Sequence, residues 1–132
     1  MEKNPVIIQI DEDENYLTIG ELLCYNMGLS ISATATTING AKEILARIQA
    51  GRLKPDIAII SSMIEVDMND GKKLATKLRE LVPGIKIIAY SLDKEDDWGD
   101  RIAIKTTKDS KESLISALED LTGHSFKFSN LP

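Results

Sequence analysis

The hydrophobic residues of this chain form short runs that alternate with stretches of helical spacing. Runs rich in β-branched residues predict five strands, at residues 6–10, 31–36, 57–60, 85–90 and 102–104. Apolar residues three and four positions apart predict four helices, over residues 16–27, 41–48, 74–82 and 114–121. Because strands and helices alternate and the strands are almost continuously apolar, we predict a parallel sheet with helices on both faces.

Local signals mark the ends of several elements. Asn39 is expected to cap the start of the second helix, and Asp109 and Glu112 have capping-box spacing at the start of the last one. The run 31–36 alternates large and small residues, which predicts a strand at the edge of the sheet. Residues 93–101 are fewer than the roughly twelve that a helical crossover between parallel strands needs. The helix between the fourth and fifth strands is therefore expected to be short or absent.

Polar side chains follow the predicted strands. Parallel sheets bind ligands at the carboxyl ends of their strands, where the strand order reverses. The residues at those ends are carboxylates, small hydroxyls and one lysine: Asp11, Glu12, Asp13, Glu14, Ser61, Ser62, Ser91 and Lys105. We expect these side chains to gather at one edge of the sheet, which we call the carboxyl rim.

Five segments together match the sequence pattern of a known family, and the match depends on their order and spacing. They are I-I-Q-I-D-E-D-E, N-G-A-K-E-I-L-A-R-I, K-P-D-I-A-I-I, D-M-N-D-G-K-K-L and I-K-I-I-A-Y-S. From residue 5 to about residue 123 the chain resembles the receiver domain of two-component response regulators. The resemblance implies a flavodoxin-like α/β fold, with a five-stranded parallel sheet in the order 2-1-3-4-5. It also implies a receiver-like domain over residues 1–123, followed by a C-terminal tail at 124–132.

The resemblance further implies roles for residues of the carboxyl rim. In receivers an acidic pair binds Mg²⁺, an aspartate ending the third strand accepts phosphate, and a hydroxyl and a lysine contact the phosphoryl group. Position by position, Asp11 and Glu12 match the acidic pair, Ser91 matches the hydroxyl, and Lys105 matches the lysine.

The acceptor position departs from the receiver pattern. Counting six residues from Pro55 reaches Ser61, not an aspartate. An acyl phosphate needs a carboxylate, and a serine hydroxyl is a poor nucleophile without a neighbouring base. The fifth strand, I-A-I at 102–104, also lacks the aromatic residue that changes rotamer in receivers. We therefore predict a phosphorylation-independent pseudo-receiver: a non-enzymatic signalling domain that binds a protein partner or forms a homodimer.

Two other functions stay open as alternatives. One is a true phosphoreceiver whose acceptor has moved to Asp67 or Asp11, although Asp67 falls in a loop longer than the receiver pattern has. The other is a small flavodoxin-like domain that binds a ligand. No glycine-rich loop follows the first strand, and the acidic turn there would repel a phosphate that lacks a cation.

The residues of the carboxyl rim also have simpler interpretations. Residues 11–14 are either a solvated loop with helix-capping acids or a retained divalent-ion pocket. In the second case Asp11 and Glu12 would bind Mg²⁺ weakly, because few ligands remain. Serines such as Ser61 and Ser91 more often pack in the protein or lie in loops than take part in chemistry. Without a carboxylate at position 61, Lys105 is able to pair with Asp11 or Glu12 with no metal, which would close the pocket.

Three aromatic residues are candidates for a protein interface: Trp98 in the acidic segment 93–101, and Phe126 and Phe128 in the tail. An exposed aromatic side chain in an acidic loop is a common interface anchor. The alternative is that these side chains fold back onto the domain's own core.

The composition of the chain excludes several classes of protein. The chain has 132 residues, a net charge of -5 and 42% hydrophobic residues, which is typical of one globular domain. Its single cysteine, Cys24, and single histidine, His124, exclude a disulfide framework and a zinc module, and favour a reducing compartment. The first apolar run is too short for a signal peptide or a membrane span. The acidic balance lacks the basic patch that nucleic acid or anionic membrane requires. We expect a cytoplasmic protein without nucleic-acid or membrane partners.

Overall fold

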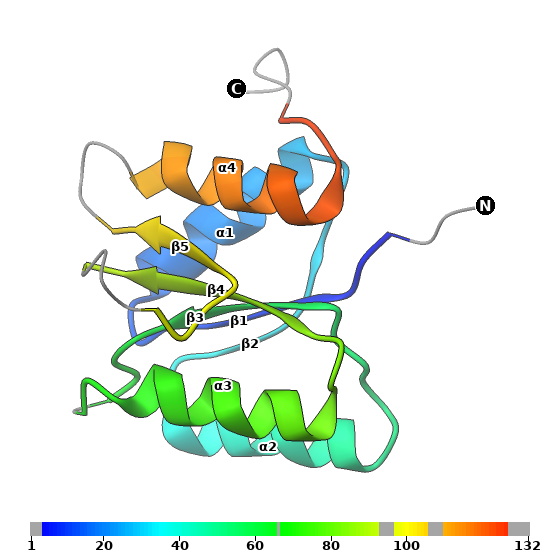
Figure 1. The fold of residues 1–132 in the computed structure, drawn as a ribbon, viewed down its shortest axis with the longest axis vertical. Coiled ribbons are helices and arrows are strands. Elements are labelled where there is room, and N and C mark those ends of the chain that lie inside the picture. Colours follow the sequence, from blue (N-terminus) through cyan, green and yellow to red (C-terminus); the bar gives the residue numbers. More distant parts are fainter. Residues whose placement is uncertain (1–3, 66, 93–96, 106–109, 127–132) are drawn as a thin grey trace.

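The computed structural model describes residues 4–65, 67–92, 97–105 and 110–126, and it contains one parallel five-stranded sheet in the order β2-β1-β3-β4-β5 (Figure 1). The strands are β1 (Ile7–Ile10), β2 (Ile31–Ala35), β3 (Ile57–Ser61), β4 (Lys86–Ser91) and β5 (Arg101–Ile104). The helices are α1 (Glu14–Asn26), α2 (Ile38–Gln49), α3 (Asp70–Leu81) and α4 (Ser110–Thr122). The predicted flavodoxin-like sheet and its strand order are confirmed, as is the position of β2 at an edge.

Helices cover both faces of the sheet, α1 and α4 on one face and α2 and α3 on the other (Figure 1). Successive side chains of a strand point to opposite faces. Ile8 and Ile60 therefore pack under α2 and α3, whereas Ile7 and Ile59 pack under α1 and α4. All four are fully buried, and each such burial stabilises the fold by about 1.5–3 kcal/mol. The strands are continuously apolar because both faces are covered.

The described part of the connection between β4 and β5 contains no helix, as the length of that segment predicts. A turn occupies its end instead, and the half-buried Trp98 packs against the core under α2 and α3. Gly99 lies so close to the sheet that a Cβ there would be 2.8 Å from the backbone nitrogen of Ala89. From α3, Arg79 donates a hydrogen bond of 2.8 Å to the carbonyl of Trp98. The turn is thus attached to both the sheet and α3.

Helix α1 packs most of its predicted apolar face on the sheet: Tyr16, Ile19, Leu23 and Met27 belong to or contact the core under α1 and α4. Leu22, which has the same spacing, is 39% exposed instead. Gly20 lies directly on the buried side chain of Gln9: a Cβ there would be 1.9 Å from Gln9 Oε1. A glycine is required at this close approach, and it turns the helix toward the sheet on that side.

The predicted cap at Asn39 is wrong. Helix α2 begins two residues earlier, and the hydroxyl of Thr37 accepts a hydrogen bond of 3.0 Å from the backbone N–H of Gly40. Asp109, the other predicted cap, lies outside the described residues. No helix in the described ranges has both the length and the apolar character needed to cross a lipid bilayer.

Candidate functional site at the carboxyl rim

The sheet itself positions the main residues of the carboxyl rim. Asp11 directly follows β1, and its backbone N–H donates to the carbonyl of Ala35 at 3.0 Å. Ser61 is the last residue of β3. Lys105 directly follows β5 and continues its pairing, since its N–H donates to the carbonyl of Ser91 at 2.8 Å. These backbone contacts fix where each side chain starts.

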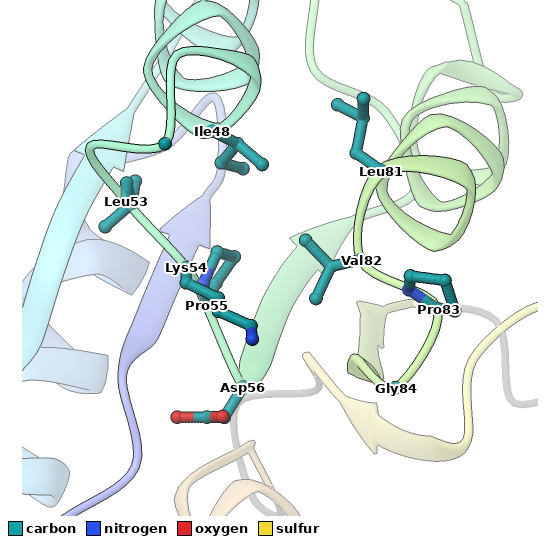
Figure 2. A pocket seen from close by; sticks show the side chains of 10 residues that line it. Ile48, Leu53, Lys54, Pro55, Asp56, Leu81, Val82, Pro83 and Gly84 are labelled. Carbon is teal, nitrogen blue, oxygen red and sulfur yellow. The ribbon is translucent and has the colours of Figure 1, made fainter.

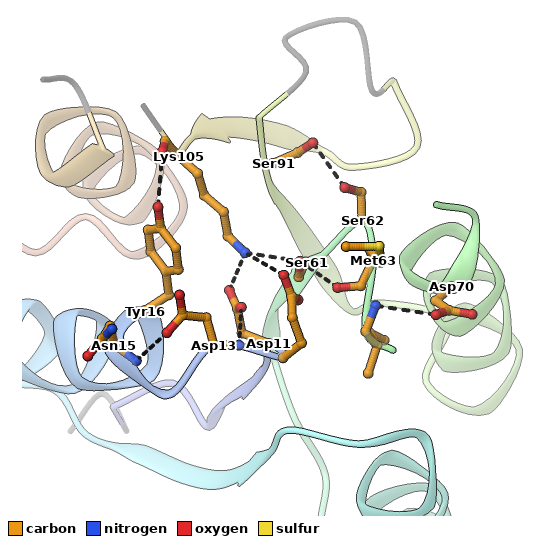
Figure 3. A network of polar contacts seen from close by, with 12 residues as sticks. Asp11, Asp13, Asn15, Tyr16, Ser61, Ser62, Met63, Asp70, Ser91 and Lys105 are labelled. Carbon is orange, nitrogen blue, oxygen red and sulfur yellow. Dashed lines mark hydrogen bonds and ion pairs between the residues drawn. The ribbon is translucent and has the colours of Figure 1, made fainter. Parts of the chain in front are cut away.

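The side chain of Lys105 reaches back across the rim to the end of β1 (Figure 3). Its Nζ lies 2.6 Å from Asp11 Oδ2, 3.0 Å from Ser61 Oγ and 3.9 Å from Glu12 Oε1. The side chains of Lys105 and Asp11 are only 5% and 1% exposed, whereas that of Glu12 is 32% exposed. The pairing of Lys105 with Asp11 that the sequence predicts is present.

Burial dominates the electrostatics of this pair. It raises the pKa of Asp11 from 3.8 to about 6, because a carboxylate loses its hydration in the interior. Lys105 and the backbone N–H of Asp13 act in the opposite direction, since both stabilise the charged form. The ion pair therefore forms at a net cost in solvation.

Two tyrosines enclose the ammonium group. The Nζ of Lys105 lies 4.5 Å from the ring centre of Tyr16 and 5.4 Å from that of Tyr90, both within cation–π range. The two rings meet edge to face, with centres 5.3 Å apart. The hydroxyl of Tyr16 donates to the backbone carbonyl of Lys105 at 3.1 Å. The lysine is therefore held at both its backbone and its charged end.

Sequence reasoning did not assign these tyrosines to the site. Tyr16 belongs to the apolar spacing of α1, and Tyr90 to the apolar run of β4. Only their neighbours in the sequence indicated that they lie near the site: Tyr16 closely follows the acidic residues 11–14, and Tyr90 immediately precedes Ser91.

The three serines of the carboxyl rim lie in two separate groups of contacts. Ser61 Oγ donates to the carbonyl of Met63 at 2.9 Å while it accepts from Lys105. Ser91 Oγ lies 3.1 Å from Ser62 Oγ, and both serines are buried (Figure 3). The structure thus brings Ser91 to Ser62, which the sequence placed on the rim without a specific partner.

The start of α3 packs against the end of β3. A Cβ at Gly71 would be 2.1 Å from the carbonyl oxygen of Ser61, so only glycine fits at this approach. Downstream of β3, Asp67 accepts from the backbone N–H of Asn69 at 2.8 Å and pairs with Lys73 at 3.3 Å. These two contacts lower the pKa of Asp67, the backbone hydrogen bond contributing most. The carboxylate of Asp67 is therefore bound to the loop before α3 and to α3 itself.

The acidic pair does not form a preorganised Mg²⁺ site. Mg²⁺ requires an octahedral set of oxygen ligands. Within the described ranges, no group of three or more His, Cys, Asp or Glu residues is arranged to hold a metal. Asp11 Oδ2 contacts the Lys105 ammonium, and Asp11 Oδ1 accepts from the backbone N–H of Asp13 at 3.0 Å. Both oxygens are thus already in contact with protein donors.

The candidate interface aromatics have different surroundings. Phe126 is buried in the core under α1 and α4, and its N–H donates to Glu119 Oε2 at 3.0 Å. Trp98 is half-buried against the opposite core. For these two residues the structure favours the alternative that they pack on their own domain. Phe128 lies outside the described residues.

A cavity of about 520 Å³ opens at the opposite edge of the sheet, before β3 and β4 (Figure 2). Its walls are largely apolar and include Ile48, Leu53 and Val82. The carboxylate of Asp56, which borders it, accepts from the backbone N–H of Val6 at 2.8 Å. Among the residues that line this cavity there is no cluster of titratable groups comparable to that of the carboxyl rim, so the rim is the candidate site.

No protein-family model matches the sequence, and no curated protein matches it. Several solved structures are similar to the fold. One is a CheY-like response regulator receiver domain protein from Methanospirillum hungatei JF-1, with 20% identity and a TM-score of 0.69, covering 90% of this chain and 94% of that one.

A second similar structure is the signal receiver domain of an HD domain-containing protein from Pseudomonas fluorescens Pf-5, with 18% identity and a TM-score of 0.68. The alignment covers 90% of this chain and 94% of that one. A third is the RcsB response regulator of Salmonella typhimurium, with 15% identity, a TM-score of 0.71 and coverage of 91% and 62%. The chain therefore has the fold of response-regulator receiver domains.

Proposed function

We propose that this chain is a pseudo-receiver: a non-enzymatic signalling module that works without phosphorylation by binding a protein partner or a second copy of itself. We place it in the cytoplasm, because its single cysteine, Cys24, is a buried free thiol suited to a reducing compartment.

The observation that carries the proposal is the contact of the Lys105 ammonium with Asp11 and Ser61. The ammonium, carboxylate and hydroxyl satisfy one another inside a buried pocket. A phosphoryl group entering there would have to compete with the contacts of Lys105 to Asp11 and Ser61, and the ammonium also lies within cation–π range of two tyrosine rings. A closed pocket of this kind supports a role that needs no phosphate.

The chemistry of Ser61 supports the same conclusion. A serine becomes a nucleophile when a neighbouring base removes its proton. The hydroxyl of Ser61 donates that proton to the carbonyl of Met63, which is not a base, and accepts from Lys105. The hydrogen bonds described for Ser61 therefore leave its oxygen unactivated.

The relocated acceptors are also poorly placed. Asp67 is bound to Asn69 and Lys73 in the loop before α3. Asp11 is buried and paired with Lys105, so its carboxylate would have to leave that ion pair to attack a phosphodonor. Neither geometry favours an acyl phosphate.

Intact-mass spectrometry tests the proposal. The protein is incubated with a small-molecule acyl phosphate and Mg²⁺, beside a receiver domain that retains its acceptor aspartate as a positive control. We expect the control to gain about 80 Da, the mass of one phosphoryl group, and this chain to gain nothing. A base-labile adduct of that mass on any carboxylate of this chain would overturn the proposal.

A thermal-shift screen tests the ligand-binding alternative. A ligand at one hundred times its Kd stabilises a protein by about 2.7 kcal/mol, which raises the melting temperature by several degrees in a domain of this size. We expect no shift with nucleotides, flavins or divalent ions. A reproducible shift with a nucleotide or flavin would favour a flavodoxin-like ligand-binding domain instead.

A further inference from the structure

A groove runs between α2 and α3 on their outer surface, away from the sheet. The two helices lie side by side, and no other described element covers them on that side (Figure 1). A cavity of about 380 Å³ lies between them, floored by Ile38, Ala41, Leu45 and Leu74. We call this the α2–α3 groove.

The groove continues along both helices. A neighbouring cavity of about 320 Å³ shares Lys42, Leu45 and Lys77 with the first and adds Leu81 to the apolar wall. The half-buried Leu45 and Leu81 therefore form one apolar strip with the floor of the first cavity. A strip of this kind suits the apolar side of an extended or helical peptide.

The border of the groove carries charges of both signs. Three lysines, Lys42, Lys73 and Lys77, line the first cavity. The acidic residue beside them is Asp70, whose carboxylate accepts from the backbone N–H groups of Ile64 at 3.3 Å and Glu65 at 3.1 Å. Asp70 is therefore engaged with the loop before α3.

Three further acids lie near the groove. Glu65 accepts a hydrogen bond of 2.8 Å from the backbone N–H of Ile38, which lines the first cavity. Lys73 pairs with Asp67, but the lysine side chain is 71% exposed, and exposed pairs of this kind are weak. Glu80 borders the far end of the groove, beside the second cavity. Lys42 and Lys77 flank the apolar strip where the two cavities join, and they give that part of the border its positive charge.

We propose that the α2–α3 groove binds an acidic, amphipathic segment of a partner protein. Its apolar side chains would contact Leu45 and Leu74, and carboxylates beside them would pair with Lys42 and Lys77. This inference rests on the proposed function, because it names the surface and the chemistry by which the partner is bound. Lysines on both sides of an apolar strip favour a partner segment that carries carboxylates beside its apolar side chains.

Selection of peptides from a random library tests the proposal directly, because the selection requires no identified partner. The full chain is immobilised and used to select binders from a phage-displayed library. We expect the selected sequences to place Asp or Glu beside Leu, Ile or Phe. Failure to select binders, or selection of basic or uncharged ones, would overturn the proposal.

The best synthetic peptide is then measured by fluorescence anisotropy against charge-reversed variants. The variant Lys42→Glu/Lys77→Glu should bind at least about tenfold more weakly, because attraction becomes repulsion at two sites. The matched control Lys54→Glu/Lys111→Glu makes the same charge change at exposed lysines outside the groove and should bind within about twofold of wild type. Circular dichroism confirms that both variants are folded.

Two further results would contradict the proposal. Equal weakening by both double variants would show that only the net charge matters. Self-association of the chain that Lys42→Glu/Lys77→Glu abolishes would make a second copy the occupant of the groove. Neither result bears on the phosphorylation test, so failure of the groove and failure of the pseudo-receiver assignment are distinguishable.

Discussion

Replacing Lys105 by methionine should destabilise the protein increasingly as the pH rises. Methionine keeps much of the apolar stem of lysine but removes the ammonium 2.6 Å from Asp11. The carboxyl of Asp11 is then buried without that cation, and it can avoid an unpaired charge only by binding a proton.

The magnitude follows from the pKa of Asp11. Its pKa is about 6 in the folded protein against an ordinary value of 3.8, so Asp11 favours folding below pH 3.8 and loses that contribution as the pH rises through 6. At about 1.4 kcal/mol per pH unit, the loss levels off at about 3 kcal/mol in the wild type. Without Lys105 the pKa of Asp11 should lie higher still, because no cation then stabilises the carboxylate, and the loss of stability continues to rise above pH 6.

Above pH 6 the variant should therefore become less stable than the wild type by about 1 kcal/mol per pH unit, beyond a pH-independent loss of packing and cation–π contact. Urea unfolding followed by circular dichroism between pH 5.5 and 8 measures both terms. The same substitution in an Asp11→Asn background should lose the pH dependence, because asparagine does not titrate. A destabilisation that stays constant over this range, or a slope that survives in the asparagine background, would refute the role assigned to the pair.

Two other predictions concern the elements around the site. Thr37→Ala should lower the free energy of unfolding by about 1 kcal/mol, because it removes the hydroxyl that caps α2, whereas Asn39→Ala should have little effect; the reverse order in urea unfolding would restore the cap predicted from sequence. Arg79→Ala should cost about 1–2 kcal/mol and shift the fluorescence of Trp98 to the red, because Arg79 holds the turn before β5. Lys73→Ala, which removes an exposed ion pair with Asp67 at the start of α3, is the control and should leave the Trp98 spectrum unchanged.

The fold was predictable because its signals are local and repeated. Buried parallel strands must be apolar on both faces, and that requirement produces continuous runs in the sequence. The signals failed where a contact between distant residues decided the outcome. Gly20 turns α1 toward Gln9, which spacing along the helix does not reveal. The sequence did not distinguish the cap at Thr37 from one at Asn39, because both residue types favour that position.

The sequence predicted which residues lie together at the site, but it predicted less well which of them contact each other. The ends of parallel strands meet at one edge, which brings Asp11, Ser61 and Lys105 together. The enclosing tyrosines have no motif, since an aromatic residue in an apolar run is also what a core requires. Only the three-dimensional arrangement assigns Tyr16 and Tyr90 to the lysine.

The proposed mode of signalling follows from which parts of the molecule are free to respond to a partner. A ligand shifts an equilibrium only by its differential affinity for two states. At the carboxyl rim, any change must break a buried ion pair and move a lysine away from two aromatic rings. At the α2–α3 groove, exposed lysines and half-buried leucines are available without breaking a buried contact. A partner that binds the groove therefore meets a smaller opposing free energy than a phosphoryl group at the rim, and recognition of a fixed surface is the easier way for this chain to transmit a signal.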